Sequence, residues 1–247
     1  MKNIIDLTGR KILVTGASSG IGRETSILLS QIGANVVIVG RNDKELTNTM
    51  AAMNDGNHKS FTCDLMELEN VKELVLNAVD YDGNKLDGLV HCAGISIDLP
   101  LKNLEYNKMD QLMKTNFYSF IELVKNFSRK NISGGGSIVG VSSRAAIGGA
   151  KCQTIYSASK AALDASVRTL AIELVQKKIR INSVRPGFIK TALVNNYMET
   201  CGVGSAGERQ LLGIGEPIDV ANLIAFLLSD ATRFITGRSF EVDGGRF

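Results

Sequence analysis

Short runs rich in β-branched residues alternate with longer amphipathic stretches from Lys11 to the carboxyl end, and this alternation limits the possible folds more than any other feature of the chain. Seven of the runs are mostly continuous apolar segments, as strands buried on both faces require. They cover residues 11–14, 35–39, 60–63, 88–91, 137–141, 179–184 and 239–242. Because strands that alternate with helices form a parallel sheet covered on both faces, the pattern predicts a doubly wound α/β fold.

The amphipathic stretches predict helices between these strands. Their first residues lie near Gly20, Asp43, Leu68, Leu104, Tyr156 and Pro217. Proline suits the first turn of the last helix, whose apolar run ends at Leu228. The stretch 191–215 is spotted with glycine and weakly periodic, which is typical of a mobile loop or lid over a site. We therefore expect one domain over residues 1–247, with a substrate-binding lid at about 191–215.

Charge and cysteine usage exclude several classes of function. The 28 basic and 25 acidic residues give a formal net charge of +3 that is spread along the chain, so no nucleic-acid partner is expected. The four cysteines form no Cys-x-x-Cys pair and do not join the two histidines in a ligand pattern, which predicts free thiols and no metal site. No run approaches a membrane span of roughly 20 apolar residues, and we expect a cytoplasmic protein.

A glycine turn follows the first predicted strand and leads directly into a helical pattern. The turn reads Thr15-Gly16-Ala17-Ser18-Ser19-Gly20-Ile21-Gly22. Glycines let the backbone approach a pyrophosphate closely, and the free amides of the new helix favour its negative charge. A plain glycine-rich turn is the alternative, but the position after the first strand favours a dinucleotide cofactor and a three-layer doubly wound Rossmann fold with a seven-stranded parallel sheet.

The end of the second strand indicates which dinucleotide is preferred. An NAD-binding unit usually places an acid about twenty residues after the glycine turn, but this chain has Gly40 and Arg41 there. The Arg41 guanidinium could pair with a 2′-phosphate, so the sequence predicts NADP(H) in preference to NAD(H). The alternative is that Arg41 is a solvated loop charge.

Tyr156 and Lys160 lie four residues apart in a helical pattern, so one helical face carries a phenol and an ammonium. A nearby cation favours the phenolate and is expected to lower the pKa of Tyr156 from its ordinary value of about 10. The pair could then act as a general acid or base. Taken alone, it could equally be an ordinary core tyrosine and a surface lysine.

These motifs, with Ser143 and the Pro186-Gly187 step, resemble the short-chain dehydrogenase/reductase family over essentially the whole chain. The resemblance implies a catalytic tetrad of Asn116, Ser143, Tyr156 and Lys160 that interconverts a carbonyl and a secondary alcohol. Tyr156 would transfer the proton, Ser143 would hold the substrate oxygen, Lys160 would bind the nicotinamide ribose, and Asn116 would position a water molecule. The cofactor itself supplies or accepts the hydride.

The same resemblance implies a set of cofactor contacts. They include an acid beside the adenine at Asp64 and a nicotinamide clamp that begins at Pro186. The full set is Gly16, Ser18, Ser19, Gly20, Ile21, Gly22, Arg41, Asp64, Leu65, Cys92, Ala93, Gly94, Tyr156, Lys160, Pro186, Gly187, Ile189 and Thr191.

One segment departs from the family pattern. The chain reads His91-Cys92-Ala93-Gly94 where the family usually has Asn-Asn-Ala-Gly. A structural histidine is favoured over a catalytic one because the tetrad is complete elsewhere. Cys92 is expected to be a buried small hydrophobe rather than a nucleophile.

The substrate is expected to be a small-molecule or acyl-thioester carbonyl compound. Many similar family members are 3-oxoacyl-carrier-protein reductases, and Arg129 and Lys130 could present basic charge to an acidic carrier. However, Ile172 replaces an arginine expected in that group, so a free steroid, sugar or other ketone is the alternative. A non-catalytic NADP-binding sensor is a third hypothesis, and a homotetramer is the assembly that the family implies.

Overall fold

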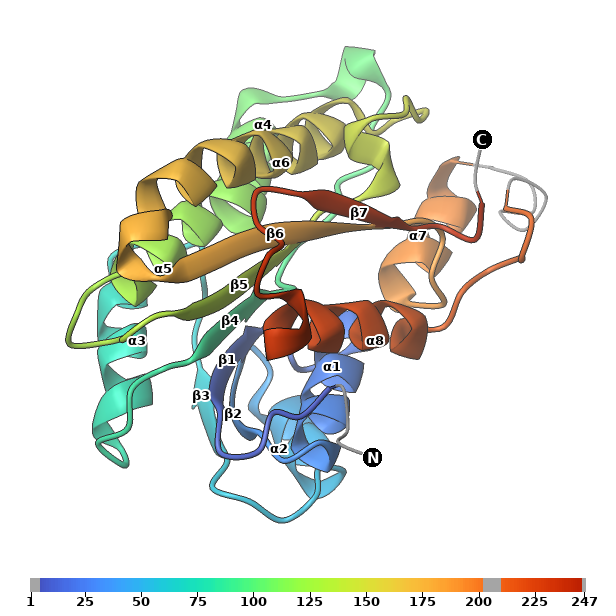
Figure 1. Cartoon of the computed structure of the whole chain (residues 1–247). Helices are drawn as coiled ribbons and strands as arrows, with labels where there is room; N and C mark the ends of the chain where they lie inside the picture. The colour runs from blue at the N-terminus through green and yellow to red at the C-terminus, as the bar shows by residue number, and fades with distance from the viewer. Residues whose placement is uncertain (1–4, 202–209, 246–247) are drawn as a thin grey trace.

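The computed structural model describes residues 5–201 and 210–245, and a parallel sheet runs through its centre (Figure 1). The strands are β1 (Lys11–Thr15), β2 (Asn35–Gly40), β3 (Lys59–Thr62), β4 (Gly88–His91), β5 (Gly136–Val141), β6 (Ile179–Pro186) and β7 (Ser239–Val242). Their order in the sheet is β3-β2-β1-β4-β5-β6-β7, and every neighbouring pair is parallel. The predicted seven-stranded doubly wound sheet is therefore confirmed.

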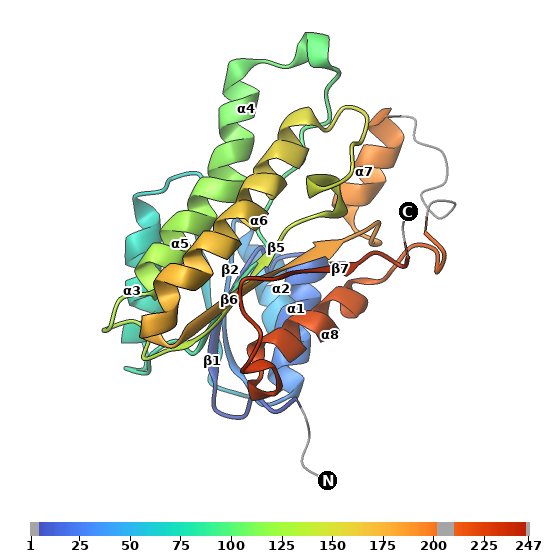
Figure 2. The same ribbon diagram turned by 45° about the horizontal axis from the view of Figure 1, so that its top comes forward.

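Helices cover both faces of this sheet. They are α1 (Gly20–Gln31), α2 (Asp43–Ala51), α3 (Asn70–Asp80), α4 (Tyr106–Met113), α5 (Ser119–Phe127), α6 (Thr154–Leu174), α7 (Ala192–Cys201) and α8 (Pro217–Leu228). Figure 2 shows α3, α5 and α6 on one side of the strands and α1, α2 and α8 on the other. The described part of the chain contains no helix of the length and apolar character needed to cross a membrane.

Successive residues of β1 explain the two layers. Leu13 packs into one core with α3, α5 and α6, whereas Ile12 and Val14 pack into the other with α1 and α8. Because side chains of a strand alternate between faces, each strand contributes to both cores, and its sequence is apolar at nearly every position. This accounts for the continuous apolar runs.

Local signals set the ends of α8. Pro217 occupies the first turn, and the side chains of Glu216 and Asp219 cap the exposed amides reciprocally. The helix runs to Leu228, as its apolar pattern predicts. Other starts differ from the predicted positions by about two residues, as at Asn70 and Tyr106.

Two stretches differ from the expectation. The helix expected from near Leu104 is divided into α4 and α5 by a π-helical turn, Lys114–Tyr118, which a periodicity of 3.6 residues cannot reveal.

The stretch 191–215 was expected to be a mobile loop or lid, but its first part forms α7. The tyrosine and cysteine of α7 are buried against the loop before α6, so tertiary packing orders a weakly periodic segment. Residues 202–209 of the predicted lid lie outside the described residues.

Candidate active site

A cleft opens at the carboxyl ends of the strands, beside the point where the sheet order reverses between β1 and β4. All eighteen residues predicted to contact the cofactor line this cleft. Ser143 lines the cleft as well, so three of the four predicted catalytic residues, Ser143, Tyr156 and Lys160, face the same cleft as the predicted cofactor contacts. Asn116 is fully buried and lies behind that wall.

The glycine turn forms a narrow cradle. A Cβ atom at Gly16 would lie 2.7 Å from the Ala93 nitrogen, and Gly16 has φ +68°, so no larger residue fits there. A Cβ at Gly22 would lie 2.3 Å from the Gly16 oxygen. Ser19, the residue before α1, places no side-chain cap on the helix amides. The close backbone approach and the uncapped amides fit a bound pyrophosphate group.

Gly40 and Arg41 form the wall beyond the cradle. A Cβ at Gly40 would come within 3.2 Å of the Ser18 hydroxyl oxygen, so a larger side chain would press on the turn. Arg41 is exposed and lines the cleft. Asp43, two residues after Arg41 in the sequence, accepts a hydrogen bond from the Thr62 hydroxyl at 3.1 Å. The cationic side chain therefore stands at the cleft and the acid is engaged with β3.

The β5 end, η3 (Arg144–Ala146) and α6 bring the reactive groups together. Ser143 caps η3 by accepting a hydrogen bond from the Ala145 amide at 3.1 Å, and its hydroxyl also interacts with the Tyr156 phenol. Lys160 Nζ donates to the Val141 carbonyl at 2.8 Å and lies 5.9 Å from the centre of the Tyr156 ring. These contacts hold one phenol, one hydroxyl and one ammonium at the cleft.

Burial controls the proton chemistry of this group. It raises the pKa of Tyr156 above its ordinary value; the Ser143 hydrogen bond opposes this rise and the Asp98 carboxylate adds to it. The net direction is therefore opposite to the lowering expected from Lys160, because desolvation of the phenolate is the largest effect on this pKa. Burial also lowers the pKa of Lys160 to about 8. At neutral pH Tyr156 holds its proton and Lys160 is mainly cationic, which suits proton donation to a carbonyl oxygen.

Asn116 occupies the π-helical turn between α4 and α5. Its Oδ1 accepts from the Ile95 amide at 2.9 Å, and its Nδ2 donates to the Ile95 carbonyl and the Ser159 hydroxyl, both at 3.0 Å. The side chain thus joins the segment after β4 to α6. Gly94 lies close to both side chains: a Cβ atom at Gly94 would lie 3.2 Å from Lys160 Nζ and 3.3 Å from Asn116 Oδ1. The predicted water-holding role of Asn116 stays a prediction.

His91 and Cys92 have the properties of structural residues. The His91 ring is completely buried, its Nδ1 pairs with the Thr15 hydroxyl at 3.0 Å, and it packs against Phe120. Burial lowers the pKa of His91 to about 3, with a smaller effect from the Lys160 charge. Burial raises the pKa of Cys92 to about 12, so its sulfur remains a thiol.

The basic residues considered for a carrier protein lie elsewhere in the fold. Arg129 and Lys130 follow α5 and precede β5, and the Lys130 carbonyl accepts from Lys85 Nζ before β4. Both residues are therefore at the amino edge of the sheet, whereas the cleft is at the carboxyl edge. Within one chain they do not border the cleft, because a helix returns the chain to the amino edge before each parallel strand.

Several cleft residues were not predicted. They are Val39, Cys63, Ile95, Thr115, Val141, Ser142, Ala192, Leu193 and Val194, and Gly40 was considered only for its lack of a carboxylate. Half of these ten residues lie at the end of a strand or directly after one, so the carboxyl ends of the predicted strands could have indicated them. Thr115 could not be found this way, since it reaches the cleft through the π-helical turn.

Comparisons with known proteins agree with this geometry. Residues 16–246 match a family model described as Enoyl-(Acyl carrier protein) reductase. The chain is 35% identical over 246 residues to the 3-oxoacyl-(acyl-carrier-protein) reductase FabG of Rickettsia conorii, covering 98% of each chain. It is 34% identical over 236 residues to carbonyl reductase family member 4 of Danio rerio, covering 96% of this chain and 97% of the relative. A short-chain type dehydrogenase/reductase structure from Mycobacterium ulcerans superimposes with a TM-score of 0.89 at 33% identity, covering 97% and 90% of the two chains.

The doubly wound sheet and the cleft at its switch point define a dinucleotide-binding α/β protein. The matches along the whole chain narrow this class: the chain belongs to the short-chain dehydrogenase/reductase family. It is accordingly an NAD(P)-dependent oxidoreductase that acts on CH–OH and C=O groups.

Proposed function

We propose that the chain is an NADP(H)-dependent reductase that converts a carbonyl to a secondary alcohol, with a 3-oxoacyl thioester on a carrier protein as the leading substrate. The observation that carries the proposal is the meeting of Ser143, Tyr156 and Lys160 at the cleft that the glycine turn borders. Bound NADPH would supply the hydride, and the protein would supply binding, orientation and a proton.

In the proposed mechanism, the Tyr156 hydroxyl donates its proton to the carbonyl oxygen of the substrate. The raised pKa of Tyr156 keeps that proton in place until the oxygen becomes basic. Ser143 donates a hydrogen bond to the same oxygen, and this bond strengthens as negative charge develops there. Lys160 holds a cationic Nζ beside Gly94, where the missing side chain leaves room for the ribose hydroxyls. Asn116 would keep this wall in register and position a water molecule.

The preference for NADP(H) rests on Gly40 and Arg41. A guanidinium at the end of β2 can pair with the 2′-phosphate, and the glycine brings no carboxylate that would repel it. The other predicted contacts, including Asp64 and Leu65 after β3 and Thr191 before α7, would complete the dinucleotide site from the opposite walls.

The relatives support the acyl-thioester substrate, since the Rickettsia conorii protein is named as a 3-oxoacyl-(acyl-carrier-protein) reductase. A free ketone such as a steroid or sugar is the second candidate. It is favoured by the exposed Ile172, where an arginine is expected in carrier-protein reductases, and by the relative named as a carbonyl reductase. A non-catalytic NADP-binding sensor ranks third because the four tetrad residues are all present.

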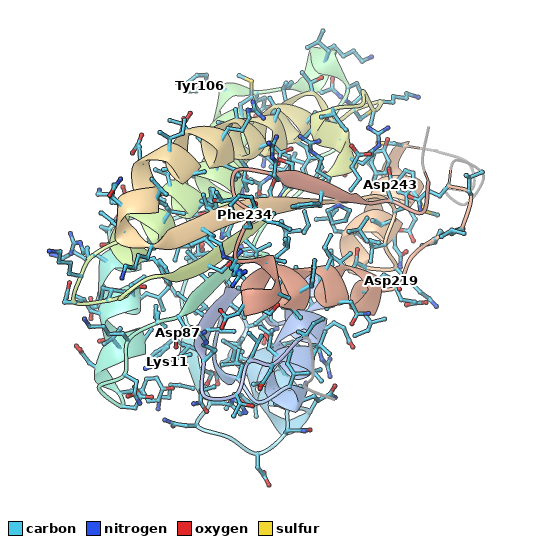
Figure 3. All side chains as sticks on the ribbon, in the orientation of Figure 1. Lys11, Asp87, Tyr106, Asp219, Phe234 and Asp243 are labelled. Atoms are coloured by element: carbon cyan, nitrogen blue, oxygen red, sulfur yellow. The ribbon has the colours of Figure 1, made fainter. Side chains whose placement is uncertain are left out.

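We also propose a homotetramer in a cytoplasmic, reducing compartment. Several large apolar side chains are exposed in the described part of the chain, and three of them, on separate elements, could serve as subunit contacts. These are Tyr106 on α4, Ile172 on α6 and Phe234 before β7, exposed by 81%, 77% and 100%. Figure 3 labels Tyr106 and Phe234 on separate parts of the surface. The four cysteines are unpaired, which fits a reducing environment.

The test is the loss of NADPH absorbance with 3-oxoacyl-carrier-protein, the matching free thioester, a diketone, a steroid ketone and a keto sugar. The leading proposal predicts the highest kcat/KM with the carrier-bound thioester. A higher value with a free ketone would transfer the assignment to the second candidate. Oxidation of NADPH with none of them would favour the sensor, and equal efficiency with NADH would reject the cofactor preference.

A further inference from the structure

Two cysteines that are far apart in the sequence meet in an apolar cluster that includes Val194, a residue of α7 that lines the cleft. Cys152 lies in the loop before α6, four residues before Tyr156, and Cys201 is the last residue of α7. Cys201 is buried in a small apolar cluster with Phe188 and Tyr197, and Cys152 packs against the same cluster. The two side chains are close enough to interact as a hydrogen-bonded pair of thiols. Neither cysteine takes part in the proposed reduction.

The loop that carries Cys152 is tied in place on two sides. The Leu99 amide donates to the Cys152 carbonyl at 3.1 Å, and the Tyr197 hydroxyl donates to the Lys151 carbonyl at 3.3 Å. The second of these bonds joins the loop to α7 one turn before Cys201. Loop and helix therefore already meet in the thiol form.

The backbone of Cys152 is unusual. Its φ is +65°, a left-handed conformation that only two non-glycine residues adopt in the described part of the chain. A side chain with a Cβ is disfavoured there by about 1 kcal/mol or more, and glycine would not be. A thiol kept at this position, in contact with a second thiol, points to a role for the sulfur.

We propose that Cys152 and Cys201 form a reversible intramolecular disulfide that fastens α7 to the loop before the catalytic helix. Helix α7 begins directly after Thr191, and its residues Leu193 and Val194 line the cleft. The linkage therefore joins α7, which lines the cleft, to the loop that leads into the helix of Tyr156 and Lys160. The oxidant is a peroxide, which the protein meets only transiently in a reducing compartment.

The chemistry balances as two successive displacements. The partly exposed Cys152, as thiolate, attacks one oxygen of hydrogen peroxide; the O–O bond breaks, and a sulfenic acid and hydroxide form. The Cys201 sulfur, after losing its proton, attacks the sulfenic sulfur; the S–S bond forms and the oxygen leaves as hydroxide. The two hydroxides take up the two thiol protons, so two thiols lose two electrons and one peroxide becomes two waters.

The first test maps the cysteines after peroxide treatment of the folded, full-length protein. Remaining thiols are alkylated in denaturant, and the peptides are identified by mass spectrometry with and without prior reduction. We expect one cross-linked peptide pair containing Cys152 and Cys201, which dithiothreitol releases. A sulfinic acid at Cys152 without the cross-link, a linkage to Cys63 or Cys92 instead, or a cross-link that forms only in denaturant would each overturn the proposal.

Matched variants separate the chemistry from folding. Cys152→Ser and Cys201→Ser should each abolish the cross-link, and Cys63→Ser should retain it. Because Cys201 is buried, Cys201→Ser could unfold, so Cys152→Gly provides a second route. Glycine accepts the positive φ, and this variant should keep or raise the melting temperature and lose the cross-link. A cross-link that persists in folded Cys152→Gly contradicts the assignment.

The second test measures amide hydrogen exchange along α7. The oxidised protein should exchange these amides about tenfold more slowly than the reduced protein, because local opening of α7 must then move the loop with it. Cys152→Gly should show no difference between the two treatments. Equal exchange in oxidised and reduced wild-type protein would contradict the fastening of α7. Neither test uses a carbonyl substrate, so both results are independent of the proposed reductase activity.

Discussion

At the amino ends of the strands, charged side chains such as Lys11 and Asp82 pair with one another; at the carboxyl ends, backbone amides, hydroxyls and the charged side chains of Arg41, Asp64 and Lys160 face a cleft. Lys11 is 2% exposed, forms an ion pair with Asp82, donates to the Asn84 carbonyl at 3.0 Å and lies 4.0 Å from the centre of the Tyr81 ring. Figure 3 shows Lys11 and Asp87 together at this edge, with Asp243 far from them beyond the end of β7. The polar groups of Lys11 at the amino edge are therefore engaged by other groups of the protein.

The carboxyl edge keeps polar groups available at some cost in packing. Gly16, Gly22 and Gly94 omit side chains that would fill the cleft. Lys160 is as buried as Lys11, at 3% exposure, but its Nζ donates to a carbonyl and burial lowers its pKa to about 8. Two buried lysines, Lys11 on β1 and Lys160 on α6, thus differ in their partners. A close carboxylate makes one structural, and its absence leaves the other suited to chemistry.

The largest expected effect is at the carboxyl edge. Tyr156→Phe removes the proton donor and should reduce kcat for carbonyl reduction by about a thousandfold, within the usual range for loss of a general acid. NADPH affinity and melting temperature should change little, because the ring remains. Tyr106→Phe, at an exposed tyrosine of α4, is the matched control and should retain full activity. Retention of most activity in Tyr156→Phe would remove the basis of the proposed mechanism.

The amino edge should respond in stability instead. Asp82→Asn leaves the Lys11 ammonium buried without its carboxylate and should lower the free energy of unfolding in urea by about 3 kcal/mol. Activity per folded molecule should be unchanged. Asp230→Asn breaks the exposed pair with Arg10 and should cost less than about 1 kcal/mol. Similar losses in the two variants would contradict the structural role given to Lys11.

Acid should weaken the same pair. Burial pushes the pKa of Asp82 upward, but hydrogen bonds from Lys11 and Asn84 outweigh it and hold that pKa below its ordinary value. A lowered pKa in the folded state contributes stability above the unfolded value of about 3.9, and this is lost as the pH falls through the folded pKa. Urea midpoints from pH 6 down to pH 3 should converge for wild type and Asp82→Asn.

Cofactor choice should depend on the wall beyond the cradle. Arg41→Ala should weaken NADPH binding by about tenfold to a hundredfold and leave NADH binding nearly unchanged, since only the 2′-phosphate loses its partner. Fluorescence titration with both cofactors measures this. Lys44→Ala, at an exposed lysine three residues later, is the control. Equal losses for NADH and NADPH would show that Arg41 acts on the fold and not on the phosphate.

The smallest effect concerns pH. Burial lowers the pKa of Lys160 to about 8, so its charge is present below that pH and is lost above it. The kcat/KM for reduction should therefore fall above about pH 8, by up to about tenfold per unit. Tyr156 keeps its proton over this range because its pKa is raised. A profile that stays flat to pH 9.5 would separate Lys160 from the chemistry.

Much of the fold could be predicted because its signals are local. The apolar run of each strand, Pro217 at the start of α8 and the glycines after β1 all act through near neighbours in the chain. Part of the cofactor site could be predicted for a related reason: parallel strands bring their carboxyl ends to one edge, so the glycine turn after β1 and Arg41 after β2 meet there. The remaining contacts were implied by the family resemblance. Arg129 and Lys130 precede a strand, and the same rule places them at the other edge.

The remaining features depend on contacts between distant segments. The pKa of Tyr156 was predicted in the wrong direction because sequence spacing shows a neighbouring lysine but not the depth of burial. At the π-helical turn, Asn116 donates hydrogen bonds to Ile95 and Ser159, and no periodicity encodes these contacts. α7 is ordered by packing against the loop before α6.

By itself, the sequence of this chain determined the order of strands and helices, the phosphate-binding turn and the types of reactive side chain, since each depends on local geometry and periodicity. Only the tertiary structure decided which buried lysine is paired, which protons Tyr156 and Lys160 hold, and that Cys152 and Cys201 meet. Those properties follow from desolvation and from contacts across the fold, and both exist only once the two cores have closed around the sheet.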